Sequence, residues 1–480
     1  MGSGRKMSHS AFNIETPARL EPKSDQIAGI IQVNNQAETK SISDTLATED
    51  DDSKSSEFEE IVEVKEVIDT FLHRILDIED CAKEYVFAAA KAYNDSAEKL
   101  KKEVDKHQKA LEEQKDETVR ILTVKELRKT LREIERHNRS SLVTTLERSL
   151  FISLFSAFDK FVGDVVAILY SKKPDLYKNI NKEISLPEAL KYDSMEELRQ
   201  VFLDREIESI RRKSYIDQFK DLEGKFSIKL TKFSEWPYFI ECAQRRNLFT
   251  HCDGIVSKQY LDICREVGCD LRDNVAVGDQ LEIGAKYLFQ SCRLLCQVGV
   301  MLGHTLWRKT LENELEKADS HLSSIVFDYL HMEHWGKAIS ISKFAQGLPR
   351  ISTDEIERIY SVNHAIALCA IDKRKEAKAI LDKKDWTATT YDFKLAYAIL
   401  TNDYVKAEEI MCKLGKEGEL INELSYHDWP LFREFRDSRE FFRAYEKVYG
   451  YKYSSKLSQI AEATKSKVEQ TNEPEGESGS

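Results

Sequence analysis

Residues that form turns are scarce in this sequence, which has only 8 prolines and 18 glycines among 480 residues. Sandwiches and barrels of β-strands need such residues every few positions, because each short strand ends in a turn. Their scarcity disfavours an all-β protein and favours long helices. At roughly 150 residues per domain, the length allows about two to four domains.

An excess of positive charge is also lacking. The formal net charge of −12 argues against a protein that coats nucleic acid regardless of sequence, because that affinity comes from Lys and Arg neutralising phosphates. A local basic site remains compatible with this total. The nine cysteines form no CxxC pair and have no zinc-finger spacing, so we expect reduced thiols in a reducing compartment.

Membrane and cofactor signals are missing as well. No run of about 18 apolar residues occurs, and the N-terminus lacks the apolar centre of a signal peptide, so a cytoplasmic protein without a membrane span is expected. The motifs GxGxxG, GxxxxGK[ST], GxSxG and HExxH do not occur. We therefore expect neither a cofactor nor a metal ion.

Composition and periodicity divide the chain into five segments. Residues 1–56 are polar and acidic and are predicted to be disordered, and so is the tail at 458–480. Residues 57–139 read as a long charged helical arm or hairpin. Residues 140–316 are the most apolar and predict an all-α bundle, and residues 317–457 predict helical repeats. The fold class is all-α.

The charged arm and the repeat region each leave a functional question open. The arm is either a solvated helical projection or a surface that binds a partner or a second copy. In the repeat region Ala338, Ala377 and Ala407 recur at intervals near the period of tetratricopeptide (TPR) repeats. Small alanines let paired helices approach closely, so the region is similar to a TPR-like α-solenoid, which often binds a protein partner.

One short stretch carries the chemistry of interest, RRNLFTHCDG at residues 245–254. On a helix Asn247 and His251 lie one turn apart on one face, and the long side chain of Arg246 can reach the same side. The three residues combine a group that titrates near neutral pH, a permanent cation and an amide, as cleavage of RNA without a metal requires. The alternative is a histidine that interacts with the dipole at a helix end.

This stretch resembles the signature of the HEPN superfamily, in which a helix carries RNxxxH and a turn with glycine follows. The earlier LERSLFISLFSAFDKFV is similar to the opening helix of that family, and VGDQLEIGAKYLFQSCRLLCQVGVMLG is similar to its closing helix. Together the resemblance covers about residues 142–310, roughly a third of the chain. It implies an all-α HEPN-like bundle within residues 140–316.

The resemblance also implies an activity. Many HEPN proteins are metal-independent endoribonucleases that leave 2′,3′-cyclic phosphate ends, act in antiviral defence or as toxins, and pair as dimers with a shared cleft. By this resemblance Arg246, Asn247 and His251 occupy the catalytic positions. The partners implied are an RNA substrate and a second copy of the chain.

Two positions depart from the family pattern. HEPN toxins controlled by AMPylation have a tyrosine two residues after the histidine, where this chain has Asp253. Regulation of that kind is therefore not expected. The first helix of the family commonly carries a glutamate where Asp159 falls here, and an aspartate can keep the acidic role. Asp159 is our candidate for a supporting residue.

Basic residues before the motif are candidates for RNA binding. Arg211, Arg212 and Lys213 are consecutive, and Arg245 precedes the motif itself. With Lys225, Lys229 and Lys232 they form a local basic excess that could follow a phosphate backbone. The alternative is a solvated face of lysines and arginines.

Two hypotheses about function follow. The first is an endoribonuclease in which His251 is the general acid or base and Arg246 stabilises the phosphate, while the arm and the repeats control it. The second is a dimeric scaffold without activity, whose TPR-like repeats bind a protein partner. An enzyme that uses a cofactor has no motif to support it.

Overall fold

The computed structural model describes residues 63–180, 183–271 and 275–453. The segments predicted to be disordered, 1–56 and 458–480, lie outside these ranges. Within the described ranges all regular secondary structure is helical, and one isolated β-bridge accompanies it. The prediction of an all-α fold is confirmed.

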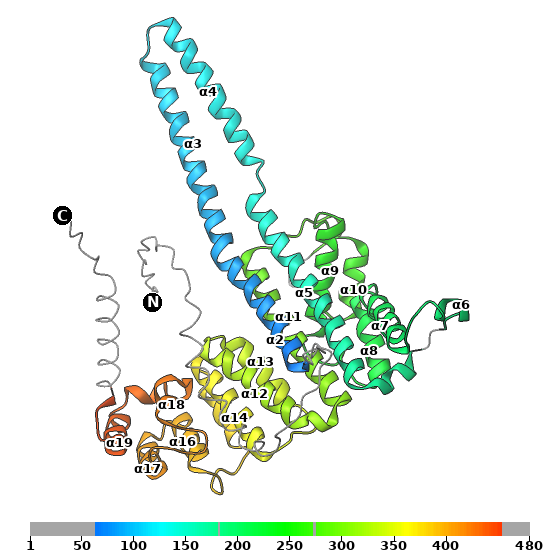
Figure 1. Ribbon diagram of the computed structural model, residues 1–480. Coiled ribbons are helices and arrows are strands. Elements are labelled where there is room, and N and C mark those ends of the chain that lie inside the picture. Colours follow the sequence, from blue (N-terminus) through cyan, green and yellow to red (C-terminus); the bar gives the residue numbers. More distant parts are fainter. Residues whose placement is uncertain (1–62, 181–182, 272–274, 454–480) are drawn as a thin grey trace, which may run out of the picture. The chain divides into compact units, whose positions relative to one another are not determined.

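The helices follow one another in chain order with mostly short connections (Figure 1). The first part comprises α2 (Val64–Cys81), a π-helical turn (Ala82–Val86), α3 (Phe87–Glu113), α4 (Glu117–Asn138) and α5 (Leu142–Lys172). The middle part comprises a 3₁₀ turn (Pro174–Asn179), α6 (Leu186–Ala189), α7 (Met195–Arg211), α8 (Tyr215–Phe226), α9 (Trp236–His251), α10 (Lys258–Glu266) and α11 (Ala285–Thr310). The last part comprises a 3₁₀ turn (Glu312–Glu314), α12 (Leu315–His331), α13 (Trp335–Gln346), α14 (Asp354–Ala370), α15 (Arg374–Leu381), α16 (Tyr391–Leu400), α17 (Tyr404–Leu414), α18 (Glu423–Asp428), two 3₁₀ turns (Pro430–Phe432 and Phe435–Asp437) and α19 (Arg439–Tyr449).

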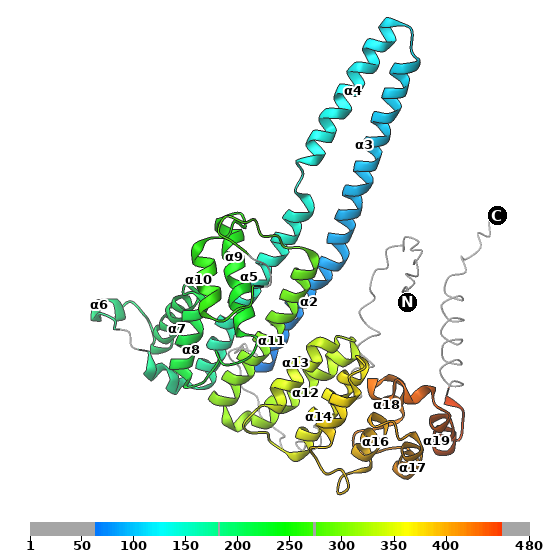
Figure 2. The same ribbon diagram turned by 180° about the vertical axis from the view of Figure 1, so that it is seen from behind.

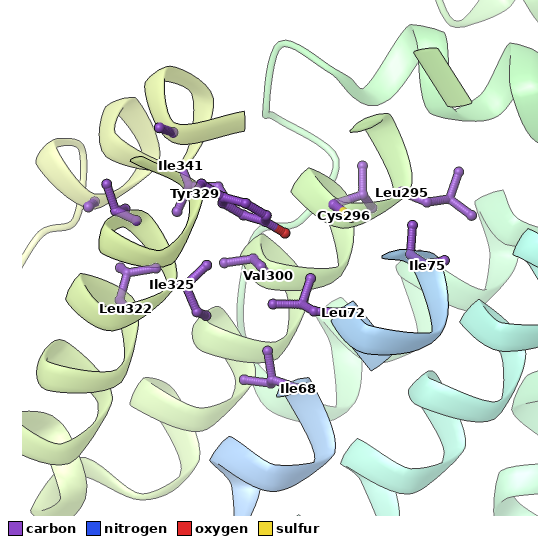
Figure 3. Close-up of a cluster of buried hydrophobic side chains, with 14 of the residues drawn as sticks. Ile68, Leu72, Ile75, Leu295, Cys296, Val300, Leu322, Ile325, Tyr329 and Ile341 are labelled. Carbon is purple, nitrogen blue, oxygen red and sulfur yellow. The ribbon is translucent and has the colours of Figure 1, made fainter. Parts of the chain in front are cut away.

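Helices α2, α5 and α11 pack against one another at the centre of the bundle. Figure 3 shows Ile68, Leu72 and Ile75 of α2 on one side of α11, with apolar residues of α12 on its other side. Gly299 of α11 allows the close approach, because a Cβ there would lie 2.2 Å from the ring of Phe71. Each large apolar side chain buried in this way stabilises the fold by about 1.5–3 kcal/mol.

The charged arm is a helical hairpin, in which α3 and α4 lie side by side in both views (Figures 1 and 2). At its base the rings of Tyr93 and His137 stack with their centroids 4.0 Å apart. Among the described residues of the two helices, only Thr130 is buried. The charge pattern predicts one arm over residues 57–139, whereas the hairpin begins with α3, because α2 buries its apolar face in the bundle.

Three helical hairpins of the C-terminal region share one turn geometry. They pair α12 with α13, α14 with α15, and α16 with α17. The middle residue of each turn has a positive φ, 55° at Glu333, 62° at Asp372 and 61° at Asn402. The amide of the next residue then donates to the carbonyl oxygen five residues earlier, over 2.8 or 2.9 Å. The same local bonding therefore closes all three hairpins.

The alanines from which a repeat is predicted occupy equivalent places in these hairpins. Ala338, Ala377 and Ala407 each lie four residues after the last residue of the turn, and each has no exposed surface. A larger side chain at these positions would push the paired helices apart. The three alanines therefore occupy equivalent positions in three helical hairpins, and the likeness to TPR repeats stays a prediction.

A buried carboxylate joins the repeats to the bundle. Oδ1 of Asp319 in α12 accepts hydrogen bonds from Arg308 of α11 over 2.5 Å and from the hydroxyl of Tyr360 in α14 over 3.0 Å. Its Oδ2 accepts from the amide of Ser352 over 2.6 Å. Removing one partner of such a buried pair typically costs about 3–5 kcal/mol, so this contact fixes α12 against both neighbours.

Two buried histidines should make the stability depend on pH. Burial lowers the pKa of His364 from 6.5 to about 4, and it lowers the pKa of His304 well below its ordinary value. Because the unfolded chain then binds more protons than the folded one, the free energy of unfolding should fall as the pH decreases from about 6.5 towards about 4. One such group contributes up to about 1.4 kcal/mol per pH unit.

Urea unfolding between these pH values checks the expectation. His364→Gln should flatten the dependence, because the group that gains a proton on unfolding is gone, while an amide can still bond to Gln346. His73→Gln, at an exposed position of α2, serves as the matched control. A wild-type stability that rises on acidification would contradict the assignment.

Candidate active site

Helix α9 ends where the turn after it forces the chain to leave the helix. The carbonyl oxygen of Leu248 accepts from the amides of Cys252 over 2.7 Å and Gly254 over 3.1 Å. Gly254 has φ +81°, and a Cβ at this position would lie 2.5 Å from the ring of Phe249. His251 is consequently the last residue of α9, as the glycine-containing turn predicts.

The chain after this turn is held by an isolated antiparallel bridge between Ile255 and Gln280. The amide of Val256 donates to the carbonyl oxygen of Asp279 over 2.8 Å, and that of Leu281 donates to Gly254 over 3.0 Å. The end of α9 is therefore tied to the segment that leads into α11.

A buried carboxylate anchors the other side of α9. Oε1 of Glu241 accepts from the hydroxyl of Tyr260 in α10 over 2.6 Å and from Nε of Arg245 over 2.8 Å. Its Oε2 accepts from the hydroxyl of Tyr287 in α11 over 2.8 Å. The guanidinium of Arg245 also lies 4.1 Å from the centroid of the Tyr287 ring. Arg245, predicted as an RNA-binding candidate, thus points into a cluster that fixes α9 to α10 and α11.

The second arginine of the pair turns to a different cluster, which joins α5, α8 and α9. Oδ1 of Asp159 accepts from the hydroxyl of Tyr215 over 2.6 Å. Nη2 of Arg246 donates to that hydroxyl over 3.2 Å and to Oδ2 of Asp159 over 3.4 Å. The guanidinium also lies over the rings of Phe155 and Tyr215, at 5.4 and 5.7 Å from their centroids. The structure therefore brings Asp159 and Arg246 together, as a supporting role for Asp159 requires.

The electrostatics of this cluster favour a tyrosine that stays protonated. Burial raises the pKa of Asp159, while the hydrogen bond from Tyr215 and the charge of Arg246 act in the opposite direction. Burial, together with the Asp159 carboxylate, raises the pKa of Tyr215 well above its usual range. Tyr215 is thus a permanent donor to Asp159, and Arg246 supplies the balancing positive charge.

Unused donors remain on the two residues that begin the motif. Nη1 of Arg246 donates to Oδ1 of Asn247 over 3.0 Å. A guanidinium has five N–H groups, and three of them take part in the bonds to Asn247, Tyr215 and Asp159. Among the described residues nothing accepts from the remaining two N–H groups or from the amide nitrogen of Asn247. The side chain of Arg246 keeps 23% of its surface exposed, so an anion could be bound here.

His251 follows one turn after Asn247 and is exposed. In the part of the chain that the structure describes, its imidazole makes no hydrogen bond and no ion pair. Close by, Asp253 forms an ion pair with Arg148 of α5. Arg148 pairs with Asp253 in the turn after α9, and Asp159, further along α5, pairs with the earlier residue Arg246, so α5 and α9 run antiparallel. His251 therefore lies at the end of the bundle where α5 begins.

The other three RNA-binding candidates make contacts within the chain. Arg211 donates through Nε to the carbonyl oxygen of Asp159 over 3.1 Å, so it braces α7 against α5. Arg212 pairs with Glu208 over 2.5 Å, and Lys213 pairs with Asp221 over 2.9 Å. Their role in binding RNA stays a prediction, and the structure adds a packing role for Arg211, whereas the ion pair of Arg212 is exposed.

Sequence reasoning missed Tyr215, Glu241 and Tyr287, which orient the two arginines. A local signal existed only for Tyr215. Ser214 caps α8 by accepting from the amide of Asp217 over 3.2 Å, so the pattern SYID marks a helix start. Glu241 and Tyr287 are 46 positions apart along the chain, and Asp159 and Tyr215 are 56 positions apart. No local spacing in the sequence reveals such pairs.

Comparison of the chain with protein-family models, with curated proteins and with solved structures finds no match. Among the described residues, no three or more His, Cys, Asp or Glu side chains are grouped so that they could hold a metal ion. The described helices include none with the length and apolar character needed to cross a membrane.

The turn after His251 can be tested by adding one methyl group. Gly254→Ala should lower the free energy of unfolding by about 2–5 kcal/mol, because a positive φ costs about 1–2 kcal/mol and overlap with Phe249 about 1–3 kcal/mol more. Gly268→Ala is the matched control, since Gly268 has φ +74° and open space around it. Urea unfolding of both variants measures the difference, and equal losses would contradict the packing of Phe249 against the turn.

Proposed function

We propose that this chain is a metal-independent endoribonuclease of HEPN type, with Arg246, Asn247 and His251 as its catalytic residues. The observation that carries the proposal is their arrangement in the last turns of α9. Arg246 is held in place by Asp159 and Tyr215, with donors to spare, and His251 is exposed one turn beyond Asn247. The resemblance of the RNLFTH stretch to the RNxxxH signature supports the same assignment.

His251, Arg246 and Asn247 have different roles in the proposed cleavage of RNA. The 2′-hydroxyl oxygen of RNA attacks the adjacent phosphorus, a new O–P bond forms, and the bond to the 5′-oxygen breaks. The imidazole of His251 accepts the proton of the 2′-hydroxyl, and a protonated imidazole returns a proton to the leaving 5′-oxygen. Arg246 and Asn247 donate to the phosphate oxygens on which negative charge develops. The products are a 2′,3′-cyclic phosphate and a free 5′-hydroxyl.

In one chain the motif offers a single histidine, His251, for two proton transfers. A homodimer in which the α9 ends of two copies meet would supply both imidazoles, as the family resemblance implies. The position of His251 at one end of the bundle supports such an approach, because its imidazole is exposed. A role in antiviral defence or as a toxin belongs to the same proposal.

The scaffold hypothesis has weaker support from the repeat region. A small cavity is lined by Ile366 of α14, Leu400 of α16 and Tyr404 of α17, and also by Pro430 and Leu431 from a later part of the chain. The repeats therefore cover part of their apolar surface with residues of their own chain. A peptide partner at this place would have to compete with them.

Cleavage by the purified protein tests the proposed activity. With a chelator present, the wild type should cut a labelled RNA and leave cyclic phosphate ends, which resist phosphatase until they are opened by acid. His251→Ala and Arg246→Ala should each lower kcat/KM by at least about 100-fold, the usual loss for a general acid or base and for a donor that stabilises developing charge. Arg246→Lys should also fail, because an ammonium has three donors and cannot bond to Asn247, Asp159 and Tyr215 while also donating to phosphate.

The controls remove similar side chains elsewhere. His73→Ala removes an exposed imidazole of α2, and Arg265→Ala removes an exposed arginine of α10 that pairs with Asp262. Both should cleave like the wild type. If His251→Ala retains full cleavage, or if the wild type cuts nothing, the proposed activity is wrong.

Tyr215 should act as a positioning residue for Arg246. Tyr215→Phe keeps the ring but removes the hydroxyl that bonds to both Asp159 and Arg246. We expect kcat to fall about tenfold with little change in KM. Because that hydroxyl lowers the pKa of Asp159, its loss should move the acid limb of the pH–rate profile to higher pH.

Tyr238→Phe is the control for this variant, since Tyr238 is an exposed tyrosine of the same α9. It should leave both the rate and the pH profile unchanged. A Tyr215→Phe chain with a wild-type pH profile would show that the hydroxyl does not act through Asp159.

A further inference from the structure

The four RNA-binding candidates before the motif are not free, although Lys229 and Lys232 nearby are exposed. Arg245 and Arg212 are paired with carboxylates, as is Lys213, and Arg211 is bound to backbone carbonyl oxygens. A cation already paired with a carboxylate gains less from a phosphate, because the first partner must be released. Exposed cations without partners among the described residues are better placed to bind a phosphate.

Helix α4 of the hairpin and the residue that caps its C-terminus carry such cations along one face. Six basic residues are exposed and form no ion pair and no side-chain hydrogen bond with any described residue, and they are Lys125, Arg128, Lys129, Arg132, Arg136 and Arg139. At 3.6 residues per turn they fall within an arc of about 100° and extend over about 21 Å. We call this set the α4 stripe. Glu126, Glu133 and Glu135 lie at its two edges.

The stripe faces away from α3. The partly or fully buried residues of α4 are Thr123, Leu127, Thr130, Glu133, Ile134 and His137. All except Glu133, which lies beside the stripe, are about 130–170° around the helix from its centre. Packing of α4 on α3 therefore requires these apolar and small residues and leaves the cations pointing outward. The stability of the hairpin gives no reason for six unpaired cations on one line.

The stripe also leads towards the candidate active site. Its last member, Arg139, follows α4 directly, and α5 begins at Leu142. In the second turn of α5, Arg148 is paired with Asp253, two residues after His251. Both views show the end of α9 at the end of the bundle where α4 joins α5 (Figures 1 and 2). A long polyanion bound along α4 would thus extend towards His251.

We propose that the α4 stripe binds the phosphate backbone of double-stranded RNA and presents a stem-containing substrate to the α9 site. The identification of RNA as the polyanion rests on the proposed function. The preference for a duplex rests on the stripe itself. Proteins that hold single strands place aromatic side chains under the bases, and the stripe contains none. Cations in a straight row match the regular phosphates of a helix, which are recognised by shape and charge.

Binding of a labelled RNA duplex to the full chain tests this proposal. The duplex should have about 20 base pairs, longer than the roughly 16 that a double-stranded RNA-binding domain spans. All chains should carry His251→Ala, so that binding is measured without cleavage. We expect Arg128→Gln/Arg132→Gln/Arg136→Gln to weaken binding by at least about tenfold near physiological salt. The slope of log Kd against log salt should fall by about 2–3.

The matched control removes three cations from the other helix of the hairpin. Lys91→Gln/Lys101→Gln/Lys109→Gln on α3 makes the same change in net charge at exposed positions. Its affinity and salt slope should equal those of the parent chain. Equal losses in the two triple variants would overturn the proposal, because they would reflect net charge alone. Circular dichroism of both variants checks that the hairpin stays helical.

Other ligands give outcomes that count against the proposal. A single-stranded RNA bound as tightly as the duplex would contradict the duplex preference. Loss of binding to phosphatidylserine vesicles in the α4 variant, with duplex binding intact, would assign the stripe to a membrane surface instead. Failure of the proposed activity is recognised separately. It appears as absence of cleavage by the wild type, whether or not the His251→Ala chain binds the duplex through the stripe.

Discussion

The geometry of the candidate site depends on one partly buried carboxylate, that of Asp159. A charged group with restricted access to water must be paired, and here the hydroxyl of Tyr215 and the guanidinium of Arg246 provide the pairing. Because these three residues come from α5, α8 and α9, the requirement fixes three helices against one another. The position of Asn247 and His251 then follows, since both belong to the same short helix as Arg246.

The two neighbouring arginines of the motif have separate structural roles. Successive residues of a helix point about 100° apart, so Arg245 and Arg246 cannot face the same partner. Arg245 bonds to the buried Glu241 and lies over Tyr287, which holds α9 to α10 and α11. Arg246 faces α5 and α8 and keeps donors for a ligand. One arginine of the doublet is therefore used for packing, and the other keeps donors that no described residue occupies.

The basic residues that cluster in the sequence are not the ones that remain unpaired on the surface of the described structure. Arg211, Arg212 and Lys213 are consecutive in the sequence and so indicate a basic site. In the structure each of them is bound to a carboxylate or a backbone carbonyl oxygen. The cations of α4 are spread over 15 positions, from Lys125 to Arg139, and interleaved with acidic and apolar residues. Only their common face and the lack of partners in the described chain set them apart. A protein with a negative net charge can thus carry a basic surface where the spacing of basic residues places them on one face of a helix.

The sequence by itself determined the local features of this protein. Long apolar stretches predict the buried helices α5 and α11, Gly254 marks the end of α9, and the spaced alanines fall at equivalent places in the helical hairpins of the C-terminal region. These features depend on neighbours within a few positions. The tertiary structure alone decided that α2 joins the core, that Tyr215 and Glu241 orient the two arginines, and which cations remain free. Their partners lie tens or hundreds of positions away, and only the packing of helices brings them within hydrogen-bonding distance.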